Sequence, residues 1–435
     1  MSRPVIVWFR RDLRTRDHPA LLEAAARSSR AVGLFVLDPV LLKPSGDPRV
    51  AFLYRCLRDL DAALGGRLVV MSGRPSEVVP RLAADLQAPS VHISADAGPY
   101  GRRRDAAVGH ALSEMDVELV ASGSPYAVTP GRIVKADGEP FKVFTPFSRA
   151  WVRHGWRAPA DTSASIVDWM SVGGEGIPVD PEVAAELPDP GEAAALRAWR
   201  HFLADADYAA RRDRPDLPGT SRMSPYLRWG CVHPRTLLAE CPDDTYRTEL
   251  AWRDFYADVL WHRPETAREN YDRKFDRMTH DDDATLFDAW CQGRTGYPIV
   301  DAGMRQLLAE GWMHNRVRMI VASFLVKDLH LPWWWGARHF MRTLVDGDLA
   351  SNQHGWQWTA GSGTDAAPYF RVFNPTTQGE KFDPNGDYVR RYVPELRGIA
   401  GKAVHKASVD GYPVPIVDHA QERLVALDRY AAIKS

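Results

Sequence analysis

The chain has 435 residues, of which 45% are hydrophobic and 26% charged; these values exclude global disorder and a small disulfide-stapled fold. Lys and Arg number 55 and Asp and Glu 56, so the formal net charge of −1 indicates no particular partner. The four cysteines form no CxxC pair and have no spacing with histidine that suits zinc, so we expect free thiols and no metal. No long apolar run and no secretory pattern occurs, which predicts a cytoplasmic protein with no membrane contact.

Short apolar runs alternate with amphipathic segments over the first 125 residues. The runs are 5–9, 33–37, 67–71, 91–94 and 118–121, and helix-period segments cover 19–28, 50–64, 76–86 and 101–115. This order predicts an α/β domain over residues 1–125 with a doubly wound, parallel five-stranded sheet. Ligands of such sheets bind beyond the carboxyl ends of the strands, so residues 10–12, 38–39 and 96–100 are expected at the rim. No GxGxxG follows the first run, and an NAD-type site is therefore unsupported.

The rest of the chain has a different composition. Residues 126–192 are rich in Pro, Gly and Asp and predict a connector between domains. Helical periodicity then dominates residues 193–435, at 194–204, 225–229, 248–260, 285–292, 299–310, 315–329 and 335–344. No run there combines the length and alternation of a strand, so this domain should be all-α.

Two predicted helix faces combine aromatic and polar side chains. One helix face is predicted to carry Glu249, Trp252, Arg253 and Tyr256, which are spaced at i, i+3, i+4 and i+7. Such a face could stack a flat ligand and hydrogen-bond its edge. A similar face occurs within residues 311–319, where two arginines flank an aromatic, an amide and a thioether. The alternative for both faces is ordinary packing of an amphipathic helix.

Two further segments are unusual in composition. Residues 346–365 interleave acids and amides with tryptophan and glycine, a mixture that lets the backbone approach a ligand while carboxylates accept hydrogen bonds from it. Six arginines lie between residues 211 and 235, which suits a phosphate backbone, although a solvated surface is the alternative.

Together these motifs resemble the cryptochrome/photolyase family, and within it the class I cyclobutane pyrimidine dimer photolyases. The resemblance runs from residue 8 to about residue 406 and is densest over 296–305, 311–319 and 346–383. It implies an antenna chromophore in the α/β domain and FAD in an all-α C-terminal domain over 193–435. By position, the residues that would hold FAD are Tyr208, Thr220, Ser221, Arg222, Met223, Ser224, Tyr246, Glu249, Arg253, Asn315, Arg318, Asp346, Gly347, Asp348 and Asn352.

The resemblance also implies a substrate, UV-damaged DNA that contains pyrimidine dimers. The residues expected to contact a flipped dimer and act in catalysis are Glu249, Trp252, Asn315, Met319 and Trp358. Light-excited reduced FAD would pass an electron to the dimer, the cyclobutane ring would split, and the electron would return. Six-four photolyases carry histidines at the positions of Asn315 and Met319, which favours the cyclobutane dimer here. The residues expected at DNA phosphates are Arg212, Arg253, Arg316, Arg371 and Lys381.

A tryptophan relay is expected to reduce the flavin, with Trp356 nearest to it and Trp333 next. The distal position holds His280, so Trp334, Trp335 or a tyrosine would replace it, or photoreduction would be slow. The loop at residues 99–105 resembles that of deazaflavin-binding members, which favours 8-hydroxy-5-deazaflavin as antenna over folate, FMN or an empty site. The alternative function is a cryptochrome-type blue-light photoreceptor; a monomer without an obligate protein partner is expected.

Overall fold

The computed structural model describes residues 3–204, 207–365, 370–406 and 408–434. The chain forms two compact units. The first comprises residues 1–182, 188–205 and 221–264, and the second comprises residues 183–187, 206–220 and 265–435. This division differs from the expected domains, because residues 126–182 and 221–264 group with the sheet.

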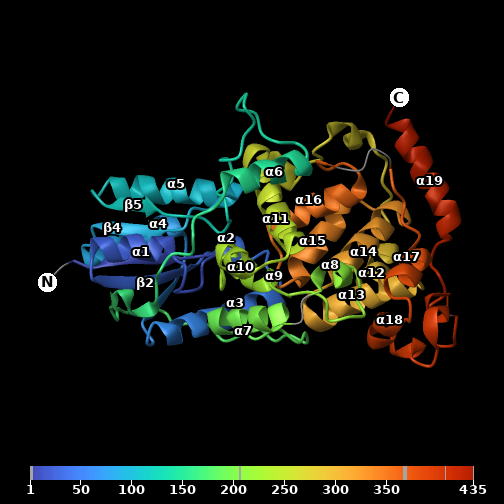
Figure 1. Ribbon diagram of the computed structural model, residues 1–435, viewed down its shortest axis with the longest axis horizontal. Helices are drawn as coiled ribbons and strands as arrows, with labels where there is room; N and C mark the ends of the chain where they lie inside the picture. The colour runs from blue at the N-terminus through green and yellow to red at the C-terminus, as the bar shows by residue number, and fades with distance from the viewer. Residues whose placement is uncertain (1–2, 205–206, 366–369, 407, 435) are drawn as a thin grey trace. The chain divides into compact units, whose positions relative to one another are not determined.

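A parallel sheet forms the centre of the first unit (Figure 1). Its strands run in the order β3-β2-β1-β4-β5, which confirms the predicted five-stranded, doubly wound sheet. A two-residue strand, β6, pairs with β2 at the margin and was not predicted. The strands are β1 Val5–Phe9, β2 Arg30–Leu37, β3 Leu68–Ser72, β4 Ser90–Ile93, β5 Glu118–Ala121 and β6 Asp168–Trp169.

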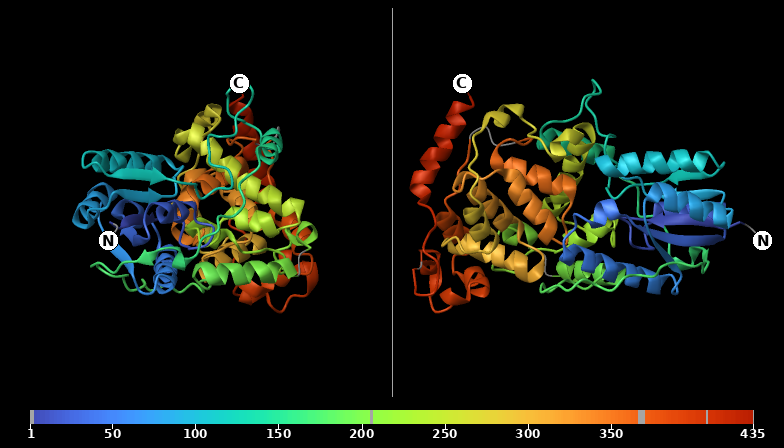
Figure 2. Two further views of the ribbon diagram at one scale, coloured as in Figure 1. Left: turned by 60° about the vertical axis from the view of Figure 1, so that its left-hand side comes forward. Right: turned by 180° about the vertical axis from the view of Figure 1, so that it is seen from behind.

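Helices cover both faces of this sheet (Figure 2). Ile6 and Trp8 lie in one buried cluster with side chains of α4 and α5, whereas α1 packs on β1, β2 and β4 from the opposite face. Because both faces of the sheet are covered, its strands appear in the sequence as apolar runs rather than as alternating patterns. The helices of this unit are α1 Pro19–Arg27, α2 Pro39–Leu42, α3 Asp47–Ala63, α4 Pro75–Leu86, α5 Pro99–Ser113, α6 Phe144–His154, α7 Gly191–Ala204, α9 Ser224–Trp229, α10 Pro234–Glu240 and α11 Asp244–His262.

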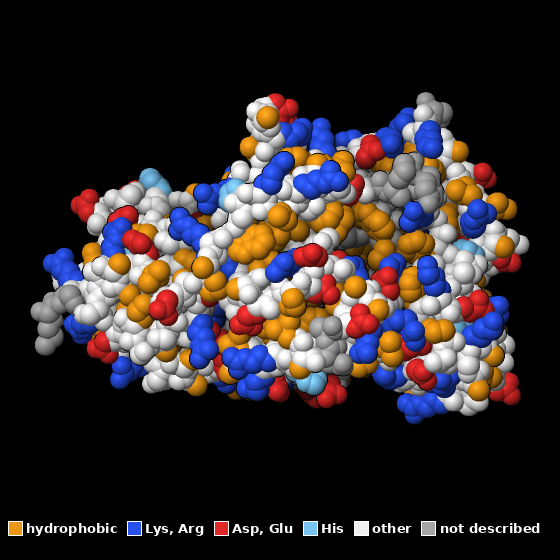
Figure 3. Space-filling model, viewed as in Figure 1, with side chains coloured by type: hydrophobic (Ala, Val, Ile, Leu, Met, Phe, Trp, Pro, Cys, Tyr) orange, Lys and Arg blue, Asp and Glu red, His pale blue; other side chains and the backbone are white. Residues whose placement is uncertain are grey.

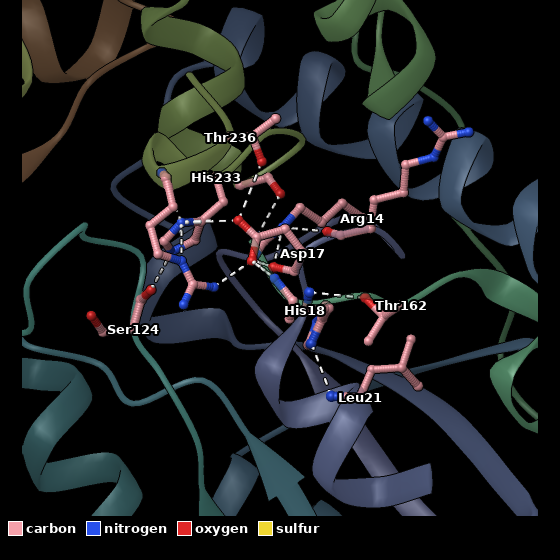
Figure 4. Close-up of polar contacts among 12 residues, drawn as sticks. Arg14, Asp17, His18, Leu21, Ser124, Thr162, His233 and Thr236 are labelled. Carbon is pink, nitrogen blue, oxygen red and sulfur yellow. Dashed lines mark hydrogen bonds and ion pairs between the residues drawn. The ribbon is translucent and has the colours of Figure 1, made fainter. Parts of the chain in front are cut away.

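A buried carboxylate, Asp17, explains why α10 belongs to the unit that contains the sheet (Figure 4). Asp17 is 3% exposed and accepts hydrogen bonds from the Arg235 guanidinium, the Thr236 hydroxyl and the Ala160 amide. Gly230 precedes α10 with φ +68°, and a Cβ there would lie 2.0 Å from the carbonyl oxygen of Arg11. The loop after β1 therefore fixes α10 through a buried ion pair and a close backbone approach.

In its described residues the second unit consists of helices and the loops that join them, with no strand. Its buried core joins α13, α14, α15 and α16 with α17 and α18. The helices are α8 Tyr208–Arg211, α12 Ala284–Cys291, α13 Pro298–Glu310, α14 Asn315–Lys327, α15 Trp333–Thr343, α16 Leu349–Ala360, α17 Pro375–Phe382, α18 Asp387–Tyr392 and α19 His419–Ala432. In the part of the chain that the structure describes, no helix has the length and apolarity needed to cross a bilayer.

Helix α16 was not predicted, because its buried face is polar. Gln353 and Gln357 donate to the carbonyl oxygens of Ala267 and Thr266 at 2.7 and 2.8 Å. Gln357 also accepts from the amide of Tyr271 at 2.8 Å. These bonds satisfy the buried amides and fix the rotation of α16, which carries several of the expected functional residues.

Candidate functional site

Arg318 and the segment 346–348, which are all expected to hold FAD, lie in the second unit. Arg318, on α14, donates to the carboxylate of Asp346 and to the carbonyl oxygen of Met313, both at 2.8 Å. Asp348 caps α16 by accepting from the amide of Ser351 at 3.1 Å. Since α14 and α16 pack against each other, Arg318 and the N-terminal part of α16 form one polar wall. Gly347 lies between the two acids, where its amide is 3.5 Å from the carbonyl oxygen of Leu344.

Asp346 has an unsatisfied oxygen. Its side chain is 2% exposed, and while Oδ2 accepts from Arg318, buried Oδ1 has no hydrogen-bond partner among the described residues. Leaving a buried acceptor unpaired costs about 1–3 kcal/mol, so this atom is suited to a donor from outside the chain. An N–H group of FAD would supply that donor, and the residues present therefore fit the cofactor.

Asn352, one turn into α16, has its amide fixed in one orientation. Its Nδ2 donates to the carbonyl oxygen of Ala337 at 3.1 Å and to Gln353 Oε1 at 2.8 Å. With both donors used, Asn352 Oδ1 remains as an acceptor. This suits the expected role of Asn352 in holding FAD, because a reduced flavin ring offers N–H donors.

Three residues expected at the lesion also belong to the second unit. Asn315 is exposed at the start of α14, and Met319 lies half-buried one turn later. Trp358, on α16, is half-buried and donates from Nε1 to the carbonyl oxygen of Asp365 at 3.1 Å. Trp358 also lines a cavity of about 410 Å³, including its mouth, together with Lys327 and Arg371.

Lys327 is a residue that the sequence reasoning missed. It is 4% exposed at the end of α14, and its Nζ donates to the carbonyl oxygen of Arg371. Burial lowers the pKa of Lys327 to about 7. The amine thus anchors the segment that carries Arg371. A lysine after the apolar run 320–326 could have suggested burial, but only the tertiary structure shows its partner.

The two tryptophans expected to take part in electron transfer, Trp356 and Trp333, are both buried. Trp356 is 3% exposed and lies edge-on to Trp290, with 6.0 Å between ring centroids. Trp333 is 2% exposed, donates to Asn270 at 3.0 Å, and contacts Trp334 with 5.9 Å between centroids.

His280, at the expected distal position, packs edge-on against Trp334 at 5.2 Å. His280 and Trp333 both line a cavity of about 410 Å³, including its mouth. Trp334 therefore contacts both Trp333 and His280. The contact between Trp290 and Trp356 was not predicted.

In the first unit, the turn before α9 carries several of the residues expected to hold FAD. Ser221 Oγ is 2.9 Å from the Tyr246 hydroxyl and accepts from the Met223 amide at 3.3 Å. Arg222 has φ +50°, and Arg222 and Ser224 are exposed. Tyr246 is 5% exposed and packs against Trp199 at 5.1 Å. The turn is thus positioned by a hydroxyl pair and an aromatic cluster.

Helix α11 carries the first-unit residues expected at the lesion. Glu249 and Trp252 are half-buried on it. Arg253 donates to the carbonyl oxygens of Pro125 and Leu227 at 2.8 and 3.2 Å, and its guanidinium lies 4.5 Å from the Tyr126 ring centroid. These contacts give Arg253 a structural role in holding α11.

The remaining expected cations and FAD residues are in the second unit. Tyr208 begins α8, with the Arg212 guanidinium 5.6 Å from its ring centroid, and Thr220 ends the segment that follows. Arg316 pairs with Asp213 at 2.8 Å, and its guanidinium is 4.4 Å from the Phe382 ring centroid.

Lys381 and Arg371 are exposed. On the face in Figure 3, Lys and Arg are interspersed with Asp and Glu, in keeping with the balanced composition. Within the described ranges, no group of three or more His, Cys, Asp or Glu could hold a metal ion.

The carboxyl rim of the sheet carries a network of ion pairs. Arg10 and Arg104 both donate to Asp105 at 2.8 Å, and Arg104 lies 3.3 Å from Asp96. Both guanidinium groups also lie near the ring of Trp8, at 4.8 and 5.2 Å from its centroid. Of the residues expected at this rim, Arg10 and Asp96 both take part in the network.

Comparisons with known proteins agree with this geometry. Residues 5–164 match the family described as DNA photolyase, and residues 246–432 match the FAD binding domain of DNA photolyase. A deoxyribodipyrimidine photo-lyase of Thermus thermophilus is 42% identical, with 98% of each chain covered.

Two solved structures are similar to the whole chain. A class III photolyase of Agrobacterium tumefaciens has a TM-score of 0.91 and 37% identity, with 100% of this chain and 98% of that chain covered. An archaeal photolyase of Sulfolobus tokodaii, described with two FAD molecules, has a TM-score of 0.91 and 32% identity, with 99% and 100% covered. The first of these leaves the class I assignment unconfirmed. The chain belongs to the DNA photolyase family.

Proposed function

We propose that this protein repairs cyclobutane pyrimidine dimers in UV-damaged DNA in a light-dependent reaction with bound FAD. The observation that carries the proposal is that α14 and α16 each combine the two kinds of residue required. Helix α14 carries Arg318 for the flavin and Asn315 and Met319 for the lesion. Helix α16 carries Asn352 for the flavin and Trp358 for the lesion. Because these helices pack on each other, cofactor and substrate residues share one rigid support.

When bound and reduced, FAD supplies the light-excited electron that splits the cyclobutane ring. The chain's residues bind and orient the reactants. Arg318 and Asp346 would hold the cofactor by charge-assisted hydrogen bonds, and Asn352 Oδ1 would accept a hydrogen bond from a protonated flavin nitrogen. Extrusion is easiest for a damaged base pair that stacks poorly, which contributes to selectivity.

Lesion recognition is assigned to residues that offer stacking surfaces and hydrogen bonds. Trp252 and Trp358 present indole rings for stacking. Glu249 and Asn315 would hydrogen-bond the carbonyl and imide edges, and a protonated Glu249 would stabilise negative charge on the dimer. The positions of Asn315 and Met319 carry no histidine as proton donor, which supports a cyclobutane dimer over a six-four product. The class I assignment remains part of this proposal.

The cations near these residues are assigned to flanking DNA phosphates. Arg212, Arg316, Arg371 and Lys381 would position the strand without reading its sequence. Arg253, in contrast, uses two of its donors on backbone carbonyls, so we assign it mainly to support of α11.

For photoreduction we propose that electrons enter through Trp334, Trp333 and Trp356. The contact between Trp333 and Trp334 supports this order, with Trp334 in place of the missing distal tryptophan. A branch through Trp290 and Trp335 is the competing route, because Phe287 contacts both rings, at 5.9 and 5.2 Å.

A second chromophore is proposed at the rim formed by Arg10, Arg104 and their acidic partners. The loop at residues 99–105 favours 8-hydroxy-5-deazaflavin, with folate or FMN as alternatives. The second FAD in the Sulfolobus protein supports a flavin-type antenna in this fold. Absorbance spectra of apoprotein reconstituted with each chromophore decide among them.

The proposal is tested with two oligonucleotides that differ only in their lesion. One carries a cyclobutane thymine dimer and the other a six-four product, and each is incubated with reduced holoprotein in the light or in the dark. We expect loss of the cyclobutane dimer in the light only. No repair of either lesion, with light-driven flavin spectral changes intact, would favour the cryptochrome-type alternative. Repair of the six-four product alone would contradict the lesion assignment.

A further inference from the structure

Trp252 is stacked face to face on a phenylalanine from another helix. The ring of Phe144, the first residue of α6, lies 3.6 Å from the Trp252 ring, centroid to centroid, with an interplanar angle of 8°. Phe144 is 7% exposed, whereas Trp252 is half-buried. Aromatic pairs in protein cores usually prefer offset or edge-on arrangements at 4.5–7 Å. A close parallel pair therefore indicates that the surrounding structure holds both rings in place.

Helix α6 is fixed to α11 at two further points on the same face. Phe147 packs on Phe255, with 5.1 Å between ring centroids. One turn later, Trp151 donates from Nε1 to Asp254 at 2.9 Å, and both side chains are buried. The spacing of residues 144, 147 and 151 places all three contacts on one side of α6. Phe144 is thus positioned by a helix that is itself anchored.

Two more rings, both on α11, contact Trp252 without stacking on it. Phe255 lies edge-on at 5.7 Å and 75°, and Tyr256 is tilted at 5.3 Å and 43°. Both come from α11 itself, and neither is parallel to the indole. Of these three rings, Phe144 is therefore the one that lies parallel to the indole and can fix its plane.

We infer that Phe144 is a positioning residue for the lesion, because it holds the indole plane of Trp252 ready to stack on the everted dimer. The inference rests on the proposed role of Trp252. Without the Phe144 ring, the indole could change rotamer and would have to be ordered again on binding. Ordering one side chain at an interface weakens binding by about 2- to 12-fold, which sets the expected effect.

The test compares Phe144→Leu, which keeps apolar volume without a ring, with Phe144→Tyr, which keeps the ring. The matched control is Phe35→Leu, because Phe35 is 7% exposed like Phe144 but lies in β2 of the same unit, away from α6 and α11. Affinity is measured in the dark by fluorescence anisotropy with a dimer-containing oligonucleotide and with its undamaged counterpart. Thermal unfolding and FAD content of each variant are recorded alongside.

We expect Phe144→Leu to weaken dimer binding by about 2- to 12-fold, with undamaged DNA bound as before. Phe144→Tyr should restore dimer affinity, and Phe35→Leu should leave it unchanged even if stability falls. Equal dimer affinity in wild type and Phe144→Leu would overturn the inference, as would equal losses in the Leu and Tyr variants. Trp252→Ala separates the two proposals. If that variant binds the dimer normally, the role of Trp252 fails and the inference fails with it. If only Trp252→Ala weakens binding, the inference alone fails.

Discussion

Replacement of Asp346 by alanine should weaken FAD binding selectively. Asp346 Oδ2 accepts a hydrogen bond from Arg318 at 2.8 Å, and the buried Oδ1 has no partner among the described residues. Bound FAD would donate a hydrogen bond to Oδ1. A hydrogen bond to a charged group contributes about 1.5–3 kcal/mol. At 1.4 kcal/mol per factor of ten, losing this bond corresponds to an affinity loss of about 10- to 150-fold. Arg318 would also lose its ion-pair partner, so the upper part of this range is expected.

The assay is calorimetric titration of FAD into apoprotein, with flavin content per purified chain as a second readout. Asp387→Ala is the matched control, because Asp387 forms an exposed ion pair with Arg390 at 2.6 Å and should not affect the cofactor. Asp346→Asn, which keeps the shape and one acceptor oxygen, should lose less affinity than Asp346→Ala. Wild-type FAD affinity in a folded Asp346→Ala protein would refute the proposed hydrogen bond between Asp346 Oδ1 and the flavin.

Three further experiments test separate parts of the account. Trp334→Phe should slow photoreduction of bound oxidised FAD in transient absorbance, while Trp335→Phe should not; the reverse pattern would favour the branch through Trp290. Glu249→Gln should lower the repair yield per absorbed photon, and an undiminished yield would count against a protonated Glu249. Burial raises the pKa of Asp254 from 3.8 to about 6, so its contribution to stability is lost as pH rises through that interval. In urea unfolding, the stability of Asp254→Asn relative to wild type should therefore grow by about 1–1.5 kcal/mol from pH 5 to pH 8, and a constant difference would contradict the pKa.

The strands and most helices could be predicted because burial imposes a simple pattern on them. Val5–Phe9 is covered on both faces and is therefore continuously apolar. Helix α16 escaped prediction because Gln353, His354 and Gln357 occupy its buried face and bond to a neighbouring loop or to the helix itself. Hydrophobic periodicity cannot report a face whose polar groups are satisfied only by tertiary contacts.

For the candidate site, too, the sequence could indicate which residues take part but not how all their polar atoms are paired. The sequence indicated Arg318 and Asp346 as site residues, and the structure pairs them. It could not indicate that one oxygen of Asp346 stays unpaired, because that depends on the packing around it. Phe144 lay in a segment expected to be a connector, where the 144, 147 and 151 spacing of its buried aromatics was the overlooked signal.

The most direct test of the central claim is the dependence of dimer repair on bound FAD and light. Apoprotein is reconstituted to graded FAD contents, reduced, and mixed with UV-irradiated oligothymidine, and the dimers lost per photon are measured in light and in darkness. We predict loss that rises in proportion to bound FAD and vanishes in darkness or without the cofactor. Dimer loss in the dark, or loss that does not depend on FAD content, would contradict the claim.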